Sequence, residues 1–150
     1  MFDAVVVEPS KKADSAVIWL HGLGASGHDF EPVLPLLELD NKTTRFIFPH
    51  APELPVTVNG GMSMPAWYDI EHIDIDRTID IPGISLSADR VDAIVQTQMD
   101  EDIPANRIIL VGFSQGTMLA LYTAIREKMS GVVGYSGAFI GKAPNIFEYR

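Results

Sequence analysis

Short apolar segments recur along this chain between stretches of helical periodicity, and this alternation constrains the fold more than any other feature. Apolar runs without polar alternation are typical of strands covered on both faces of a sheet. They lie at residues 4–8, 16–20, 45–49, 108–112 and 132–136. The first two runs, separated by a polar turn, are predicted to pair. Helical patterns follow Asp29, Ser87 as a predicted N-cap, and Ser114, so the order favours an α/β fold with a mainly parallel sheet and flanking helices.

The composition fits a single folded domain and excludes several classes of function. Of the 150 residues, 47% are hydrophobic, which is enough for a sizeable core. The net charge of −9 repels phosphate backbones, so we expect no nucleic-acid partner. Cysteine is absent, which excludes disulfides, thiolate metal sites and a cysteine nucleophile, and which fits a cytoplasmic protein. The first 20 residues have neither the basic start nor the uninterrupted apolar run of a signal peptide or membrane anchor.

The strongest candidate for chemistry is the segment G-F-S-Q-G at residues 112–116, which follows an apolar run directly and opens a helical pattern. A nucleophile elbow requires this strand–turn–helix setting. Small residues beside the serine let strand and helix approach closely, and a strained backbone lifts the serine hydroxyl above the carboxyl edge of the sheet. The segment predicts that Ser114 is a nucleophile and that the amide of Gln115 faces a substrate oxygen. The alternative is an ordinary glycine-rich turn with a capping serine.

A second glycine-rich segment, H-G-L-G-A-S-G at residues 21–27, follows the run at 16–20. Such a loop can direct backbone N–H groups at a developing negative oxygen. Residues 22–27 also match G-x-G-x-x-G, so the loop could instead cradle a phosphate, but no P-loop lysine follows. Together with the elbow, the segment predicts an oxyanion-hole loop in which His21 braces the backbone and does not act as a general base.

Three segments carry a resemblance: WLHGLGASGHDF, FPHAPELPVTVNGGMSMPAWYDI and RIILVGFSQGTMLAL. In this order they resemble the carboxylesterase/phospholipase family of α/β-hydrolases, which includes bacterial carboxylesterases and acyl-protein thioesterases (lysophospholipases). The resemblance implies the α/β-hydrolase fold, with Ser114 as the nucleophile and the backbone amides of Leu23 and Gln115 as oxyanion donors. The family usually has a glycine where this chain has Thr117.

The irregular segment 49–83 is rich in Pro, Gly and Asp and is interpreted as a long excursion over the scaffold. The resemblance implies that its first part, residues 49–69, borders the substrate groove. Its apolar side chains would line an acyl or ester tail: Leu54, Val56, Met62, Met64 and Trp67.

The departure from the family lies after the serine. A serine hydrolase needs a base for the hydroxyl proton and a third group to orient that base. In this fold the order along the chain is Ser, then Asp or Glu, then His. Beyond Ser114 the chain has neither histidine nor aspartate, and all four histidines precede it: His21, His28, His50 and His72. We therefore expect residues 1–150 to form one α/β-hydrolase domain that lacks its C-terminal part, equivalent to about the first two-thirds of the fold.

The sequence thus predicts a serine hydrolase that acts through an acyl-serine intermediate on a small acyl ester, thioester or lysophospholipid. The alternative is a catalytically dead hydrolase-like binding module, because the base is absent from these residues. No cofactor is expected, and H-I-D-I-D at 72–76 is interpreted as a solvated acidic edge and not as a metal site. If the run at 132–136 ends the sheet, its apolar edge is open to a homodimer or to the protein's own C-terminal fragment.

Overall fold

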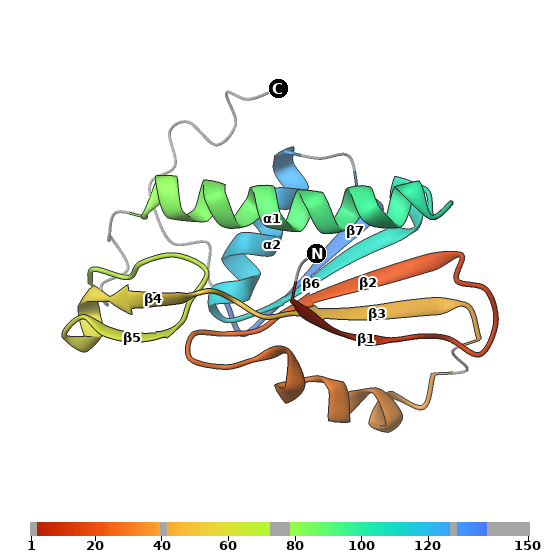
Figure 1. The fold of residues 1–150 in the computed structure, drawn as a ribbon, viewed down its shortest axis with the longest axis horizontal. Helices are drawn as coiled ribbons and strands as arrows, with labels where there is room; N and C mark the ends of the chain where they lie inside the picture. The colour runs from red at the N-terminus through yellow and green to blue at the C-terminus, as the bar shows by residue number, and fades with distance from the viewer. Residues whose placement is uncertain (1–2, 40–41, 73–78, 127–128, 138–150) are drawn as a thin grey trace.

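A five-stranded sheet forms the centre of the computed structural model, which describes residues 3–39, 42–72, 79–126 and 129–137 (Figure 1). The strand order is β1-β3-β2-β6-β7. Strands β2, β3, β6 and β7 run parallel, and β1 is antiparallel to β3. All five predicted strands are present: β1 (Ala4–Val7), β2 (Ser15–Leu20), β3 (Thr44–Pro49), β6 (Ile108–Phe113) and β7 (Gly131–Tyr135). The predicted α/β class with a mainly parallel sheet is confirmed.

The predicted pairing of the first two strands is wrong, because β3 lies between β1 and β2. In β2, the side chains of Ala16, Ile18 and Leu20 are buried, which suits a central strand with parallel neighbours on both sides. In β1, by contrast, Val6 is 44% exposed, which suits an edge. The polar turn between the two strands therefore does not make a hairpin, and β1 pairs with β3 through Val5 and Phe48.

Helices α1 (Ile81–Asp100) and α2 (Gln115–Arg126) lie on one side of the sheet, and two 3₁₀ segments, η1 (Gly27–Asp29) and η2 (Glu31–Leu37), lie on the other (Figure 1). The predicted helix after Asp29 is 3₁₀ and not α, since Pro35 lies inside it and removes an amide that an α-helix would need. Phe30 anchors this side by stacking on Trp19 at 5.2 Å between ring centroids.

Helix α1 begins seven residues earlier than predicted. Asp80 is its N-cap, and a carboxylate oxygen accepts a hydrogen bond from the amide of Gly83 at 2.9 Å. Ser87 therefore lies inside the helix, where it is buried and donates its hydroxyl to the carbonyl of Trp67. The serine was a plausible cap by residue type, but Asp80 followed by proline in the first turn is the stronger start signal.

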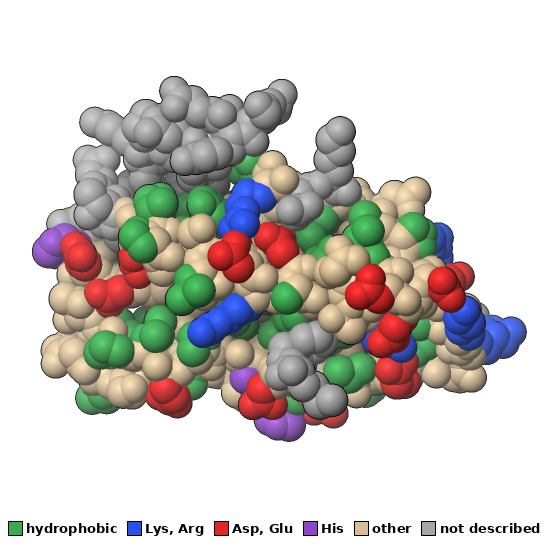
Figure 2. All heavy atoms as spheres, turned by 45° about the horizontal axis from the view of Figure 1, so that its top comes forward, with side chains coloured by type: hydrophobic (Ala, Val, Ile, Leu, Met, Phe, Trp, Pro, Cys, Tyr) green, Lys and Arg blue, Asp and Glu red, His purple; other side chains and the backbone are tan. Residues whose placement is uncertain are grey.

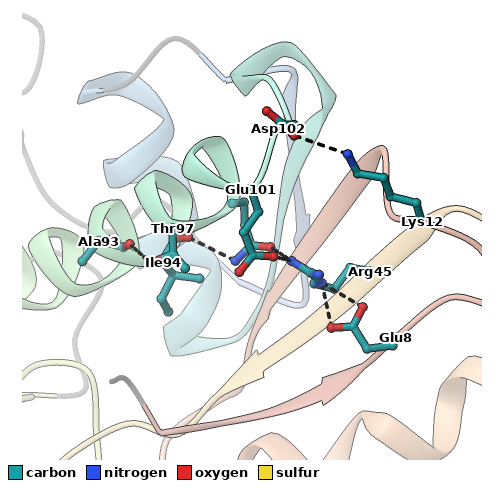
Figure 3. A network of polar contacts seen from close by, with 9 residues as sticks. Glu8, Lys12, Arg45, Ala93, Ile94, Thr97, Glu101 and Asp102 are labelled. Atoms are coloured by element: carbon teal, nitrogen blue, oxygen red, sulfur yellow. Dashed lines mark hydrogen bonds and ion pairs between the residues drawn. The ribbon is translucent and has the colours of Figure 1, made fainter.

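Arg45 connects three elements at the end of the sheet opposite to the glycine-rich loops (Figure 3). Its guanidinium donates to the carboxylate of Glu8 after β1 at 3.0 Å and, at the end of α1, to Gln98 at 2.7 Å and Glu101 at 2.5 Å. Its side chain is only 16% exposed, so these contacts stabilise the packing of α1 on the strands. Elsewhere on the α1 side, acidic side chains are spread among apolar ones (Figure 2).

Residues 53–65 form a β-hairpin within the predicted excursion. It consists of β4 (Glu53–Val56) and β5 (Met62–Pro65), joined through the 3₁₀ turn η3 (Thr57–Asn59), and it projects beyond the end of the main sheet (Figure 1). Gly60 and Gly61 both have positive φ angles in the connection. Asn59-Gly60 between two short apolar runs is a hairpin signal, although the runs are too short to predict strands by themselves.

Candidate active site

Ser114 lies in a strained turn between β6 and α2. Its φ angle is +52°, in the left-handed region that non-glycine residues seldom adopt. The serine is exposed, and its amide donates to the carbonyl of Tyr135 on β7 at 3.0 Å. Its own carbonyl accepts from the amide of Thr117 at 3.0 Å in the first turn of α2. These contacts place the serine at the carboxyl end of the parallel strands, where the elbow was predicted.

The two glycines of the segment 112–116 are required by close approach. A Cβ on Gly112 would lie 2.5 Å from the Cα of Thr117, and one on Gly116 would lie 2.6 Å from the carbonyl oxygen of His21. Real Cβ atoms do not approach other atoms so closely. The start of α2 therefore packs directly on the ends of β6 and β2, and a side chain at either glycine would push the serine away.

The loop at residues 21–27 passes beside the serine. A Cβ on Gly22 would be 3.4 Å from the Cβ of Ser114, so the two segments touch. Gly24 has a φ of +73° and donates its amide to the carbonyl of Pro65 at 2.8 Å. Among the described residues, no partner is seen for the amides of Leu23 and Gln115. Gln115 is the first residue of α2, where amides lack helical acceptors.

His21 is fully buried at the start of this loop. Its Nε2 accepts a hydrogen bond from the amide of Ala51 at 3.0 Å, so the ring proton sits on Nδ1, which donates to the carbonyl of Gly22 at 2.7 Å. Burial lowers the pKa of His21, although the bond to Gly22 partly opposes this. The imidazole is therefore neutral with both nitrogens occupied, which fits the predicted bracing role.

Four of the five residues predicted to line a groove pair across the hairpin, Leu54 with Met64 and Val56 with Met62, but the five differ widely in exposure. Val56 is fully buried and Trp67 is 2% exposed, whereas Met62 is 65% exposed. The Sδ of Met64 lies beside Gly24, 3.9 Å from where a Cβ would be. Leu54 and Trp67 line a pocket of about 280 Å³ between the hairpin and the first turns of α1.

Ser114 is not among the residues that line this pocket. Its wall includes the carboxylates of Asp69 and Asp80, which accept hydrogen bonds from Thr57 and from Gly83, respectively. Partial burial acts to raise the pKa of Asp69, but the bonds from Thr57 outweigh it and lower the pKa. These carboxylates therefore serve the fold, and both acids that line the pocket among the described residues are hydrogen-bonded.

The remaining predictions concern metal binding and membrane anchoring. No cluster of three His, Cys, Asp or Glu side chains that could hold a metal ion occurs among the described residues. Most of the H-I-D-I-D segment, residues 73–76, falls outside them. In the described ranges, no helix combines the length and apolar character needed to cross a bilayer.

Two side chains with a role at the site were missed from the sequence. The Thr117 hydroxyl donates to the carbonyl of Gly112 at 2.8 Å and accepts from the amide of Tyr135 at 3.2 Å, so it joins β6, β7 and α2. The side chain of Gln115 turns away from solvent and bonds to the backbone after β5. The sequence near these residues carries no signal for the contacts. Gly112 is close to Thr117 in the chain, but the other partners lie at least 18 residues away.

Comparisons with known proteins place the chain in one family. A family model described as phospholipase/carboxylesterase matches residues 1–145. The chain is 40% identical over 135 residues to acyl-protein thioesterase 1 of Cryptococcus neoformans, covering 87% of this chain and 57% of that protein. It is 39% identical over 137 residues to acyl-protein thioesterase 1 of Schizosaccharomyces pombe, covering 90% and 61%.

The solved structures agree with these relatives. The crystal structure of Zea mays acyl-protein thioesterase 2 matches with a TM-score of 0.83 at 29% identity, covering 100% of this chain and 69% of that one. The chain thus spans less than two-thirds of the length of the two fungal relatives. The chain belongs to the phospholipase/carboxylesterase family and has the α/β-hydrolase fold, of which it forms the N-terminal portion.

Proposed function

We propose that this protein is a serine hydrolase of carboxylic esters or thioesters, in which Ser114 is the nucleophile and the amides of Leu23 and Gln115 stabilise the oxyanion. One observation carries the proposal: Ser114 has a φ of +52° between β6 and α2, with Gly22 in contact beside it. The strained turn exposes the hydroxyl, and the glycine-rich loop brings backbone donors to the same space.

In the proposed reaction, the Oγ of Ser114 attacks the carbonyl carbon of the substrate and its proton passes to a base. The carbonyl oxygen becomes an oxyanion that accepts hydrogen bonds from the two amides. The C–O or C–S bond then breaks, the alcohol or thiol leaves with the proton, and an acyl-serine remains. Water hydrolyses this acyl-serine and restores the hydroxyl.

The nearby histidines do not supply an obvious base. Both ring nitrogens of His21 are occupied. The Nδ1 of His50 accepts from the amide of Gly27 at 3.1 Å, and exposed His28 lies 3.4 Å from Glu31. A serine without a positioned base is weakly activated, so we expect Ser114, aided by the oxyanion donors, to give only a small rate in these 150 residues.

The names of the relatives support the thioester branch of the substrate class. Both fungal relatives and the maize protein are called acyl-protein thioesterases. The family description also includes phospholipases and carboxylesterases, so small acyl esters and lysophospholipids belong to the same proposal. All these substrates present an acyl carbonyl with an alcohol or thiol leaving group to one nucleophile.

Fluorophosphonate labelling tests the nucleophile. We expect one adduct per chain, located at Ser114 by peptide mapping, and formed far more slowly than in a serine hydrolase with a complete triad. Rapid stoichiometric labelling of a chain whose intact mass is that of 150 residues would show that an upstream histidine is the base, with His50 and His21 the first to substitute. No adduct at Ser114 would favour the alternative of a hydrolase-like binding module.

The oxyanion donors are tested at Leu23. Leu23→Pro removes one N–H, so we expect hydrolysis of a p-nitrophenyl acyl ester and of an acyl thioester to fall by on the order of 10²–10³. Leu23→Ala keeps the amide and is the matched control, which should retain most of the rate. Equal rates in the two variants, with circular dichroism unchanged, would show that this amide is not a donor.

A further inference from the structure

The segment Pro65–Tyr68 connects the loop at residues 21–27 with the start of α2. On the loop side, the indole Nε1 of Trp67 donates to the carbonyl of His21 at 2.7 Å, and the carbonyl of Pro65 accepts from Gly24 at 2.8 Å. Leu23 is therefore held on both sides by one segment. The ring of Trp67 also packs against the imidazole of His21 at 5.0 Å between centroids.

On the helix side, one side chain makes the connection. The Oε1 of Gln115 accepts from the amide of Trp67 at 3.0 Å, and its Nε2 donates to the carbonyl of Tyr68 at 2.7 Å. Gln115 is 5% exposed, so both bonds are shielded from water. An amide side chain suits this place because it accepts at one atom and donates at the other, as the two backbone groups require.

We propose that Gln115 acts twice: its backbone amide is an oxyanion donor, and its side chain, together with Trp67, is a positioning device that sets the separation of the two donors. This inference rests on the proposed function. Because the amides of Leu23 and Gln115 belong to different elements, their spacing depends on whatever joins those elements. Gly116 packs directly on the carbonyl of His21, and the bonds through residues 65–68 add hydrogen-bonded contacts between the two elements. The hydroxyl of Ser87 on α1 holds the same segment at the carbonyl of Trp67.

The side chain of Gln115 contacts backbone and not substrate, so its loss should affect the transition state more than substrate binding. Gln115→Leu removes the acceptor of the buried Trp67 amide and one donor to the carbonyl of Tyr68. We expect kcat to fall by about 10–100-fold, since donor misplacement of the order of 1 Å costs about that much, with KM within about twofold. Trp67→Phe removes the bond to His21, and the double variant should lose less than the product of the single losses.

Gln115→Glu gives a readout that a general packing defect would not give. A carboxylate can accept from the amide of Trp67 but cannot donate to the carbonyl of Tyr68, whereas a protonated carboxyl group does both. Burial and the facing carbonyl raise the pKa of the introduced group. The ratio of variant to parent kcat should therefore rise as the pH falls. The control is Gln96→Glu, since Gln96 is exposed on α1 and bonds only to Asp100 among the contacts seen, and its ratio should stay flat.

Amide hydrogen exchange of Trp67, followed by NMR, tests the device without any activity. We expect faster exchange at this amide in Gln115→Leu, together with the fall in kcat. Unchanged exchange overturns the inference, as does faster exchange with kcat within twofold of the parent. If Gln115→Leu does not fold, Gln115→Glu across pH decides, and a flat ratio overturns the inference. A parent that neither hydrolyses esters or thioesters nor reacts with a fluorophosphonate at Ser114 overturns the proposed function. In that case, hydrogen exchange of the Trp67 amide still tests whether the side chain of Gln115 holds the segment 65–68.

Discussion

Strands β6 and β7 end in the same way and lie side by side. Residues 112–114 read Gly-Phe-Ser and residues 134–136 read Gly-Tyr-Ser, and the register pairs their glycines and aromatic residues. The two serines have almost the same φ, +52° at Ser114 and +50° at Ser136. The rings of Phe113 and Tyr135 stack at 6.2 Å between centroids. Two neighbouring turns thus share residue pattern and local conformation.

Their surroundings differ. Helix α2 starts directly after Ser114 and packs back on the strand ends, so Gly112 is buried. Gly134 is exposed, and Tyr135 is 69% exposed. A serine with positive φ after a parallel strand defines a turn and does not by itself define a nucleophile elbow. We infer that an elbow also needs a helix start that supplies amides and a second loop in contact, and at Ser114 both conditions are met.

The two turns are also connected, because the second supports the first. The carbonyl of Tyr135 accepts from the amide of Ser114, and the hydroxyl of Thr117 lies between Gly112 and Tyr135. Substituting matched positions in the two turns therefore separates what belongs to the proposed chemistry from what belongs to the support.

The largest effect is expected at the serines themselves. Ser114→Ala removes the proposed nucleophile, so ester and thioester hydrolysis should be abolished and the fluorophosphonate adduct lost. Ser136→Ala is the matched control, and it should retain most of the activity and the adduct. Near-normal turnover in Ser114→Ala, or an equal loss in both variants, would contradict the assignment of the nucleophile.

The paired glycines should differ in stability. Gly112→Ala places a Cβ 2.5 Å from the backbone of Thr117, which cannot move aside, so we expect a loss of about 3 kcal/mol in the free energy of unfolding. Gly134→Ala meets instead the Cγ2 of Thr117 at 2.6 Å, and we expect about 1 kcal/mol. Urea unfolding measures both. Thr117→Ser removes the Cγ2, so Gly134→Ala should cost less in that background; a cost that stays the same would show that Thr117 is not the obstacle.

Thr117 itself tests the connection between the turns. Thr117→Val keeps the shape but loses the bonds to Gly112 and Tyr135, leaving buried groups unpaired, and should cost about 1–2 kcal/mol. It should also slow fluorophosphonate labelling of Ser114 several-fold, because the turn loses a support. Thr117→Ser retains the hydroxyl and serves as the control. Labelling at the parent rate in Thr117→Val would show that β7 does not support the elbow.

The strands and the strained turn at Ser114 could be predicted because their signals are local. Five apolar runs gave five strands, and the glycines at 112 and 116 stand at fixed spacing from the serine, so the backbone turn follows from adjacent residues. Strand pairing and helix starts were harder to predict, because several segments or residues compete for the same place. Strand β3 displaced β1 from β2, and Asp80 outcompeted Ser87 as the cap.

The side-chain environment of the site could not be predicted, because it depends on contacts distant in sequence. Trp67 was expected in a groove as an apolar residue, yet its indole N–H bonds to His21, 46 residues away, and the residue is buried. The Gln115 side chain reaches Trp67 across 48 residues. Residue type predicts that a buried polar atom needs a partner but does not say which one.

The smallest effect expected is a pH dependence of stability that originates on the loop side of the elbow. Burial lowers the pKa of His21, so the folded protein binds a proton less readily than the unfolded chain. The contribution of His21 is fully present above the unfolded pKa of about 6.5 and is lost as the pH falls from there through the lowered folded pKa. We expect the free energy of unfolding to decrease by less than about 1.4 kcal/mol per pH unit in this window, and His21→Gln to reduce the slope. His28→Gln is the control, because that ring is exposed and should be exposed in the unfolded chain as well.

Acidification should also speed amide exchange at Ala51, whose acceptor is the imidazole of His21, before it affects the amide of Ser114, whose acceptor is the carbonyl of Tyr135. An unchanged slope in His21→Gln would show that His21 is not the source of the pH dependence. Simultaneous loss of protection at both amides would show that the loop and the β7 turn support the elbow as one unit.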